Sequence, residues 1–218
     1  MDGAIEALRP TLRAAISELS LSVSDAQTDA LLGYLELLQR WNAHYNLTSV
    51  RDPVHMLTQH LADCLAIITP LRREVGGARV RLLDVGSGGG LPGAVVAILN
   101  PDIDVTCVDT VGKKAAFVQQ VAGELRLKNL RAAHARVEAL DAPPFDVVAS
   151  RAFASLADFV RLTRDRLAAG GVWLAMKGKS PQSEIEALPP DVTVFHVEQL
   201  SVPRLEAERC IVWMRRAA

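Results

Sequence analysis

The stretch RVRLLDVGSGGGLPGAVVAIL, residues 79–99, decides the fold. Its first apolar run, ending at Val85, is typical of a buried strand, and the apolar run after Pro92 is typical of a helix that proline opens. Five glycines, at positions 86, 88, 89, 90 and 93, lie at the junction. A turn that only connects a strand to a helix needs one or two glycines. Five indicate that a ligand approaches the backbone closely.

Short apolar strands alternate with helices after this stretch. We expect strands at about 80–85, 104–109, 130–134, 145–149 and 171–176, and helices at about 92–99, 112–125, 155–168 and 182–188. Such alternation predicts an α/β fold with a doubly wound parallel sheet. The tail differs, because VTVFHVEQLSV and ERCIVWMRR are separated only by a short polar loop. These two strands predict an antiparallel hairpin at the sheet edge, which makes seven strands in all.

Residues 1–78 have helical periodicity instead. Ser24 and Gln27 form a capping box, and the helix that they open carries an apolar stripe at Leu31, Tyr34, Leu35, Leu38, Trp41 and Tyr45. Asp52 and Pro53 begin the next helix, whose buried face is Leu57, Leu61, Leu65 and Ile68. We expect Pro70 and the Gly76–Gly77 pair to end this pattern. No flexible linker follows, so 1–78 is expected to pack as a helical cap on a domain at 79–218, in one compact unit.

Composition limits the classes of function. The chain has 218 residues, half of them hydrophobic, and a net charge of −1. Proteins that grip free nucleic acid usually carry an excess of Lys and Arg, which is missing here. The three cysteines are scattered, and neither a signal peptide nor a membrane span is evident. We therefore expect a cytoplasmic protein without disulfides, zinc or contact with a membrane.

The glycine motif alone leaves the ligand open. Gly88-x-Gly90-x-x-Gly93 fits the dinucleotide fingerprint, and Asp109 follows Gly90 by 19 residues, near the spacing of a ribose-binding acid. Asp84, however, precedes Gly86 by two residues and favours S-adenosylmethionine. A carboxylate there can bind the ammonium of the methionine part but would repel a pyrophosphate. The antiparallel hairpin also favours a methyltransferase.

Several other interpretations stay open. The turn could serve only as a connection, with Asp84 capping the helix. The chain could be an NAD-dependent oxidoreductase, a methyltransferase of a protein or small molecule, or a nucleoside-binding module without catalysis.

Candidate site residues follow the later strands. Asp109 can accept both ribose hydroxyls or cap the next helix. Arg151 can make a two-pronged contact with a carboxylate or a phosphate, and Phe153 could stack on a base or belong to the core. Lys177 and Lys179 form a small basic cluster at the same rim, although solubility alone could explain them.

The helical cap supplies further candidates. His60 and Asp63 are one helical turn apart and can share a surface, and Asn46 and Thr48 follow the Trp41 helix. Either pair could line the mouth of a cleft, or form an exposed ion pair and an ordinary turn.

Four segments together resemble one family: WNAHYNLTSVRDP at 41–53, DVGSGGGLPG at 84–93, FDVVASRAFASL at 145–156 and MKGKSP at 176–181. In this order and spacing they resemble the ribosomal RNA small subunit methyltransferase G family, formerly glucose-inhibited division protein B. The resemblance runs from about residue 30 to the hairpin. It implies a Rossmann-like, class I S-adenosylmethionine-dependent methyltransferase fold. One departure is Gly89, where proline is expected; glycine should loosen the turn without removing a contact.

The resemblance also implies an activity, which is N7-methylation of one guanine in bacterial 16S rRNA. S-adenosylmethionine is then the donor and S-adenosylhomocysteine the product, with no metal. The partner would be 16S rRNA within the small ribosomal subunit or an assembly intermediate, with no obligate protein partner. A substrate of this kind would explain the near-neutral charge of the chain, because the shape of the particle and a few Arg and Lys contacts could suffice for binding.

The site residues then divide into two sets. The donor-binding set is Asp84, Gly86, Gly88, Leu91, Asp109, Val137, Glu138 and Arg151. The substrate-binding set is Asn46, His60, Arg136, Lys177 and Lys179, with Arg136 and Lys177 positioning the reactants. Guanine N7 has a free lone pair, so we expect no general acid or base.

Overall fold

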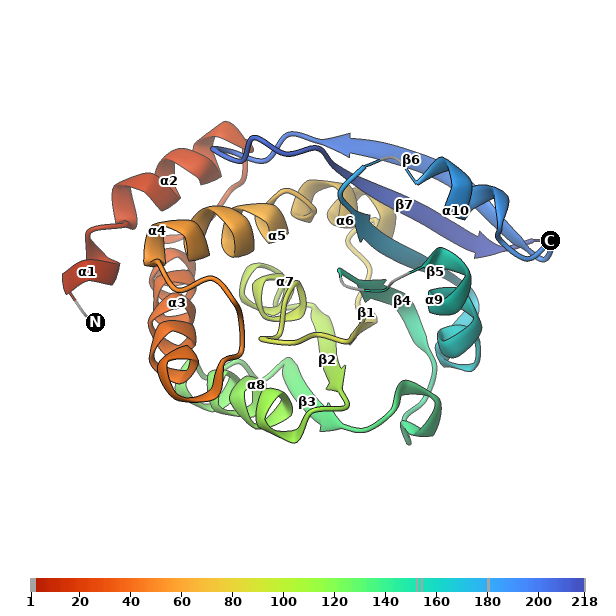
Figure 1. The fold of residues 1–218 in the computed structure, drawn as a ribbon, viewed down its shortest axis with the longest axis horizontal. Helices are drawn as coiled ribbons and strands as arrows, with labels where there is room; N and C mark the ends of the chain where they lie inside the picture. The colour runs from red at the N-terminus through yellow and green to blue at the C-terminus, as the bar shows by residue number, and fades with distance from the viewer. Residues whose placement is uncertain (1–2, 152, 154, 180, 218) are drawn as a thin grey trace.

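The computed structural model describes residues 3–151, 153, 155–179 and 181–217. A seven-stranded sheet in the order β3-β2-β1-β4-β5-β7-β6 forms the middle of the molecule (Figure 1). The strands are β1 Val80–Val85, β2 Ile103–Asp109, β3 Leu130–His134, β4 Phe145–Ser150, β5 Leu167–Lys177, β6 Val192–Leu200 and β7 Arg209–Arg216. The first five are parallel, and β7 is antiparallel to both β5 and β6. The expected α/β fold with an antiparallel hairpin is confirmed.

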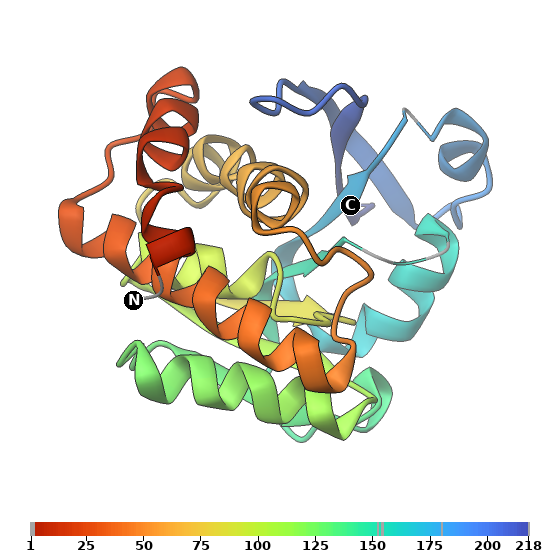
Figure 2. The same cartoon turned by 60° about the vertical axis from the view of Figure 1, so that its left-hand side comes forward.

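Helices cover both faces of the sheet. The N-terminal helices are α1 Gly3–Glu6, α2 Arg9–Glu18, α3 Asp25–Tyr45, α4 Pro53–Met56, α5 Asp63–Leu65 and α6 Ile68–Val75, with a π-helical segment Leu57–Ala62 between α4 and α5. The later helices are α7 Gly93–Leu99, α8 Gly112–Glu124, α9 Leu156–Thr163 and α10 Gln182–Glu186, and 3₁₀ turns occupy Val137–Ala139 and Arg164–Arg166. α7 and α8 pack on one face, and α9 lies on the other. The N-terminal helices form a further layer over α7 (Figure 2).

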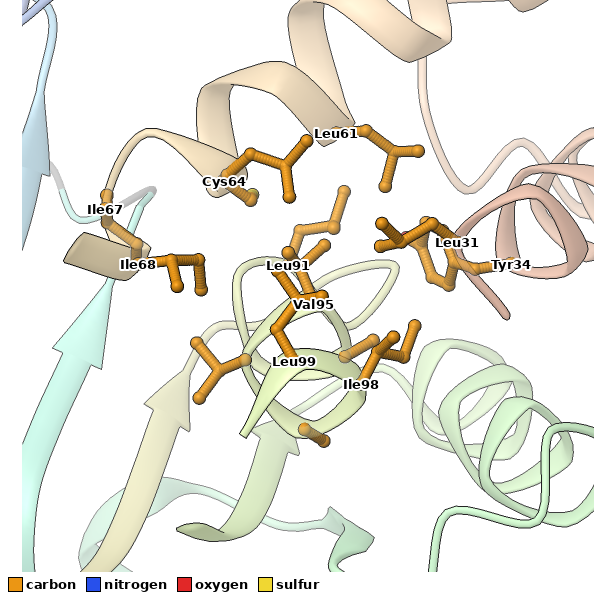
Figure 3. Close-up of a cluster of buried hydrophobic side chains, with 14 of the residues drawn as sticks. Leu31, Tyr34, Leu61, Cys64, Ile67, Ile68, Leu91, Val95, Ile98 and Leu99 are labelled. Carbon is orange, nitrogen blue, oxygen red and sulfur yellow. The ribbon is translucent and has the colours of Figure 1, made fainter. Parts of the chain in front are cut away.

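The alternation of strand side chains divides the interior into two cores. Leu82 and Leu83 are both fully buried, but they point to opposite faces and belong to different clusters. On the face of Leu82, one continuous cluster joins the sheet, α7 and the N-terminal helices. Figure 3 shows Val95 of α7 between Leu31 of α3 and Cys64 of α5. This layer holds the N-terminal helices against α7.

The N-terminal helices differ from expectation in two places. The capping box of Ser24 and Gln27 is present, but Tyr45 is 47% exposed, so its place in the buried stripe was wrong. Pro70 does not end a helix. It lies in the first turn of α6, where a missing N–H costs nothing, and Gly76, with φ of 59°, terminates that helix.

Some boundaries also shift. The helix expected over 155–168 ends at Thr163, and β5 begins already at Leu167 because this residue pairs with Phe145 of β4. The helix expected over 182–188 ends at Glu186. At Leu167, strand pairing overrides the local helical pattern. Among the described residues, no helix combines the length and apolarity that crossing a membrane requires.

Candidate functional site

The glycine turn joins the carboxyl ends of two neighbouring strands. Gly86, Gly88 and Gly90 have φ values of 65°, 58° and 79°, which side chains rarely adopt. The Gly86 N–H donates to the Val108 carbonyl of β2 at 2.9 Å, and the Gly88 N–H donates to Asp109 Oδ2 at 2.9 Å. The turn is therefore a fixed backbone surface, anchored to β2.

Asp84 lies beneath this turn and is fully buried. Its Oδ2 accepts the Gly93 N–H at 2.8 Å, at the start of α7. Its Oδ1 has no hydrogen-bond partner among the described residues. Burial raises the pKa of this carboxyl to about 7, although the Gly93 N–H and Arg151 oppose the shift. The structure thus shows the helix-capping role, and direct contact between Asp84 and a donor ammonium stays a prediction.

Tyr34 of α3 fixes the middle of the turn. Its buried hydroxyl donates to the Gly89 carbonyl at 2.7 Å. A Cβ at Gly89 would lie 3.4 Å from both the Tyr34 hydroxyl and Leu38 Cδ1, at the limit of ordinary contact. A small side chain at position 89 would therefore fit, and the helical cap holds the Gly89 carbonyl in place.

Three cavities follow the carboxyl edge of the sheet from β2 to β7. The first, of about 420 Å³, is named here the Asp109 cavity. Its lining residues are Val85, Gly86, Val108, Asp109, Thr110, Val111, Lys114, Ala135, Arg136, Val137, Glu138, Phe153 and Leu162. It combines apolar walls with two carboxylates.

The glycine-turn cavity, of about 290 Å³, lies next to it and shares Gly86 and Lys114 with it. Its lining residues are Leu38, Leu47, Thr48, Ser49, His60, Gly86, Ser87, Gly88, Gly89, Leu91, Lys114 and Arg151. The Asp63 cavity, of about 410 Å³, is lined by Ser49, Val50, Gln59, His60, Asp63, Arg151, Met176, Lys177, Gly178 and Arg209. Ser49, His60 and Arg151 belong to both of these cavities, so the three form one row.

Asp109 is held in place at the end of β2. Its Oδ1 accepts the Val111 N–H at 2.9 Å, and Lys114 Nζ lies 3.9 Å from its Oδ2. Across the Asp109 cavity, the 3₁₀ turn presents Val137 and Glu138. An apolar slot with a carboxylate on each side suits a nucleoside, whose base is flat and whose ribose hydroxyls donate.

Asp63 is the centre of a buried ionic cluster. Arg209 Nε donates to its Oδ1 at 3.0 Å, and Arg151 Nη1 lies 3.5 Å from its Oδ2. The Asp63 side chain is only 5% exposed. Burial raises the pKa of this carboxyl, and the two arginines oppose that rise. The cluster connects α5, the end of β4 and the start of β7.

His60 lies in the wall that two cavities share. Its Nε2 is 2.8 Å from Thr48 Oγ1. Burial, together with the positive charge of Arg151, lowers the pKa of His60 to about 4, so the ring is neutral at physiological pH. Lys177, which lines the Asp63 cavity with His60, contacts Glu184 at 2.8 Å. The wall therefore carries little unpaired positive charge.

Most of the predicted residues line the three cavities, and four differ from expectation. Asp84, predicted to bind the donor, is fully buried beneath the glycine turn and lines none of the three cavities. Arg136 lines the Asp109 cavity beside Val137, rather than the Asp63 cavity. Asn46 and Lys179 are exposed and line none of the three cavities. Asn46 ends α3 with a left-handed φ of 49° and accepts from Arg51.

Sequence reasoning missed Lys114, Ser49, Gln59 and Arg209 as cavity residues. Lys114 carried a signal, since it lies in the first turn of the helix that follows Asp109. His60 and Asp63 line one cavity, which is one of the two alternatives that the sequence left open, and Asp63 pairs with arginines that are distant in sequence. Within the described part of the chain, no three His, Cys, Asp or Glu side chains converge as a metal site would require.

Comparison with known proteins gives relatives over almost the whole chain. A family model described as rRNA small subunit methyltransferase G matches residues 27–212. The Ribosomal RNA small subunit methyltransferase G of Leptothrix cholodnii is 63% identical over 207 residues, covering 95% of each chain. The protein of the same name from Acidovorax ebreus is 62% identical, covering 97% of this chain and 96% of its own.

Solved structures resemble the chain in fold. The [4+2]-cyclase SpnF has a TM-score of 0.58 at 16% identity, covering 88% of this chain and 96% of its own. TrmN from Thermus thermophilus has a TM-score of 0.57 at 19% identity, covering 71% of this chain and 49% of its own. At these identities, the likeness concerns the fold alone.

Proposed function

The chain belongs to the rRNA small subunit methyltransferase G family, and on that premise we propose that it methylates N7 of one guanine in 16S rRNA, with S-adenosylmethionine as donor. One observation supports placing this reaction at the three cavities. The three cavities form a continuous row along the carboxyl edge of the parallel sheet, where ligands bind in open α/β folds.

The residues of the first two cavities fit the donor. Asp109 and Glu138 would hold the nucleoside between the apolar walls of the Asp109 cavity. The glycine turn would receive the methionine part, because Gly86 and Gly88 bring no Cβ into that space. Arg151, at the far wall, would pair with the donor carboxylate.

When bound, S-adenosylmethionine supplies a methyl carbon on a sulfonium; guanine N7 bonds to this carbon while the carbon–sulfur electron pair stays on sulfur, so no proton moves. The chain therefore needs no general base. Its contribution is to hold the nucleophile in line with the methyl group, which lowers the barrier by roughly 7–11 kcal/mol in well-oriented systems. Two residues would position the reactants: Arg151 on the donor side, and His60 in the wall between the glycine-turn cavity and the Asp63 cavity.

The Asp63 cavity would receive the guanine. It adjoins the glycine-turn cavity, and each of its cations contacts an anion: Arg151 and Arg209 share Asp63, and Lys177 contacts Glu184. Asp63 balances only one of the two arginines, and the donor carboxylate would balance Arg151. His60 is neutral there. Such a site tolerates a base that becomes cationic on methylation, because no free cation of the described residues crowds it.

Two experiments test this proposal. Nucleosides of 16S rRNA from cells with and without the gene are mapped by mass; we expect one 7-methylguanosine to be lost with the gene. The purified protein is then given radiolabelled donor and either small subunits or protein-free 16S rRNA. We expect strong transfer to the subunit and weak transfer to free RNA. An unchanged nucleoside map would refute the proposed reaction, and equal transfer to both substrates would refute the particle as substrate.

A further inference from the structure

Asp63 has a position that differs from that of the other cavity residues. It lines the Asp63 cavity but not the glycine-turn cavity, whereas Ser49, His60 and Arg151 line both. Its carboxylate therefore faces the cavity proposed for the guanine and does not border the glycine turn. Buried carboxylates are costly, so one in this place calls for an explanation beyond stability.

The two arginines bind Asp63 unequally. Arg209 Nε makes a 3.0 Å hydrogen bond to Oδ1, whereas Arg151 Nη1 lies 3.5 Å from Oδ2 and 3.4 Å from the Gln59 carbonyl. Arg209 thus anchors the carboxylate from the hairpin. Arg151 makes longer contacts and also faces the glycine-turn cavity. When Arg151 turns away, Oδ2 can accept a hydrogen bond from a ligand instead.

We propose, on the basis of the function proposed above, that Asp63 is the residue that recognises the target base as guanine. Arg151 exchanges Asp63 for the carboxylate of the bound donor, and Asp63 Oδ2 then accepts N–H bonds from the N1 and N2 edge of the guanine. Arg209 keeps Oδ1 and holds the carboxylate in position.

The chemistry of the bases supports this choice. An ionised carboxylate only accepts hydrogen bonds. Guanine offers two N–H donors on its N1 and N2 edge, whereas adenine has an acceptor at N1, which a carboxylate repels. N7 belongs to a different edge of guanine, so a base whose N7 meets the glycine-turn cavity can direct its N1 and N2 edge to Asp63. A site built to pair polar groups rejects a base that leaves them unpaired.

The same contact favours the reaction itself. Methylation makes the guanine cationic, so its N–H groups become stronger donors while the methyl group is transferred. A carboxylate that accepts from them binds the transition state more tightly than the substrate, and this raises kcat. The arrangement also orders the reaction, with the donor binding before the base.

The test uses the full-length protein and small subunits that lack the modification. Asp63→Asn keeps the shape of the side chain but replaces one of the two accepting oxygens with an NH₂ group, which donates. We expect kcat for methyl transfer to fall roughly 10- to 100-fold, as for the loss of hydrogen bonds to a charged group. The affinity for S-adenosylhomocysteine, from calorimetry, should change less than about threefold. Asp191→Asn, which removes another arginine-paired aspartate outside the three cavities, is the matched control and should retain wild-type kcat.

The double variant Asp63→Asn with Arg209→Gln separates recognition from charge balance. It removes Arg209, one of the two arginines that Asp63→Asn leaves without a carboxylate. Arg151 can still pair with the donor carboxylate, so the double variant should fold even if the single variant is unstable. We expect it to bind S-adenosylhomocysteine and still lack transfer. Recovery of transfer in the double variant would overturn the proposal, because Asp63 would then serve only to neutralise Arg209. Equal losses of product affinity and kcat in Asp63→Asn would also overturn it. If the wild-type protein itself fails to methylate small subunits, the proposed function is refuted instead.

Discussion

Gly93 at the start of α7 gives the sharpest test of the glycine turn. A Cβ at this position would lie 2.4 Å from Cys107 Sγ and 2.9 Å from Asp84 Oδ2, closer than real Cβ contacts. The Gly93→Ala variant must therefore displace the Cys107 and Asp84 side chains or move α7 away from them. Overpacking of this kind costs about 1–3 kcal/mol, which corresponds to a fall in Tm of roughly 2–12 °C for a chain of this size. We also expect weaker binding of S-adenosylhomocysteine, because Gly93 and Asp84 support the turn together.

Gly89→Ala is the matched control. Its Cβ would meet atoms no closer than 3.4 Å, and its φ is not left-handed. We expect its Tm and its affinity for S-adenosylhomocysteine to stay near the wild-type values. Thermal unfolding and calorimetry on both variants decide the matter. A Gly93→Ala protein with wild-type Tm and affinity, or a Gly89→Ala protein that is the more damaged of the two, would refute the reasoning.

Three further predictions concern the same region. Burial raises the folded pKa of Asp84 from 3.8 to about 7, so the contribution of this carboxyl to stability is greatest below pH 3.8 and is lost as the pH rises to about 7. In Asp84→Asn, this pH-dependent part of the free energy of unfolding should vanish from unfolding curves measured across that range. An identical pH dependence in both proteins would contradict the raised pKa. Tyr34→Phe removes the hydrogen bond to the Gly89 carbonyl and should lower the free energy of unfolding by about 0.5–1.5 kcal/mol; denaturant titration would show no difference if the hydroxyl contributes nothing. Lys177→Ala should retain affinity for S-adenosylhomocysteine in calorimetry and weaken methyl transfer to small subunits, and a loss of product affinity would place Lys177 in the donor site instead.

The sequence allowed the sheet and part of the Asp109 cavity to be predicted because their signals are local. The glycine turn and Asp109 each follow directly from a predicted strand, and parallel strands bring such ends to one edge. Val137 and Glu138 line the same cavity as Asp109, but they were expected from the family resemblance and not from the strand pattern. Periodicity likewise predicted the fully buried Leu57, Leu61 and Leu65. It failed at Tyr45, where the helix extends past the core that would cover it.

The ion pairs of the Asp63 cavity could not be predicted in the same way. Asp63 and Arg209 are 146 residues apart and meet only because the antiparallel hairpin returns to the helical cap. The π-helical segment Leu57–Ala62, which holds His60 and leads into Asp63, also has no signature in the pattern of apolar residues. π-helical turns often occur at functional sites, and this one places two side chains of the cap in the Asp63 cavity.

The most direct test of the central claim is a crystal structure of the protein with S-adenosylhomocysteine. We predict the adenosine in the Asp109 cavity, its ribose beside Asp109, and the amino-acid end over the glycine turn with its carboxylate on Arg151. Density for the ligand elsewhere, with the turn between Gly86 and Gly90 bare, would contradict the account.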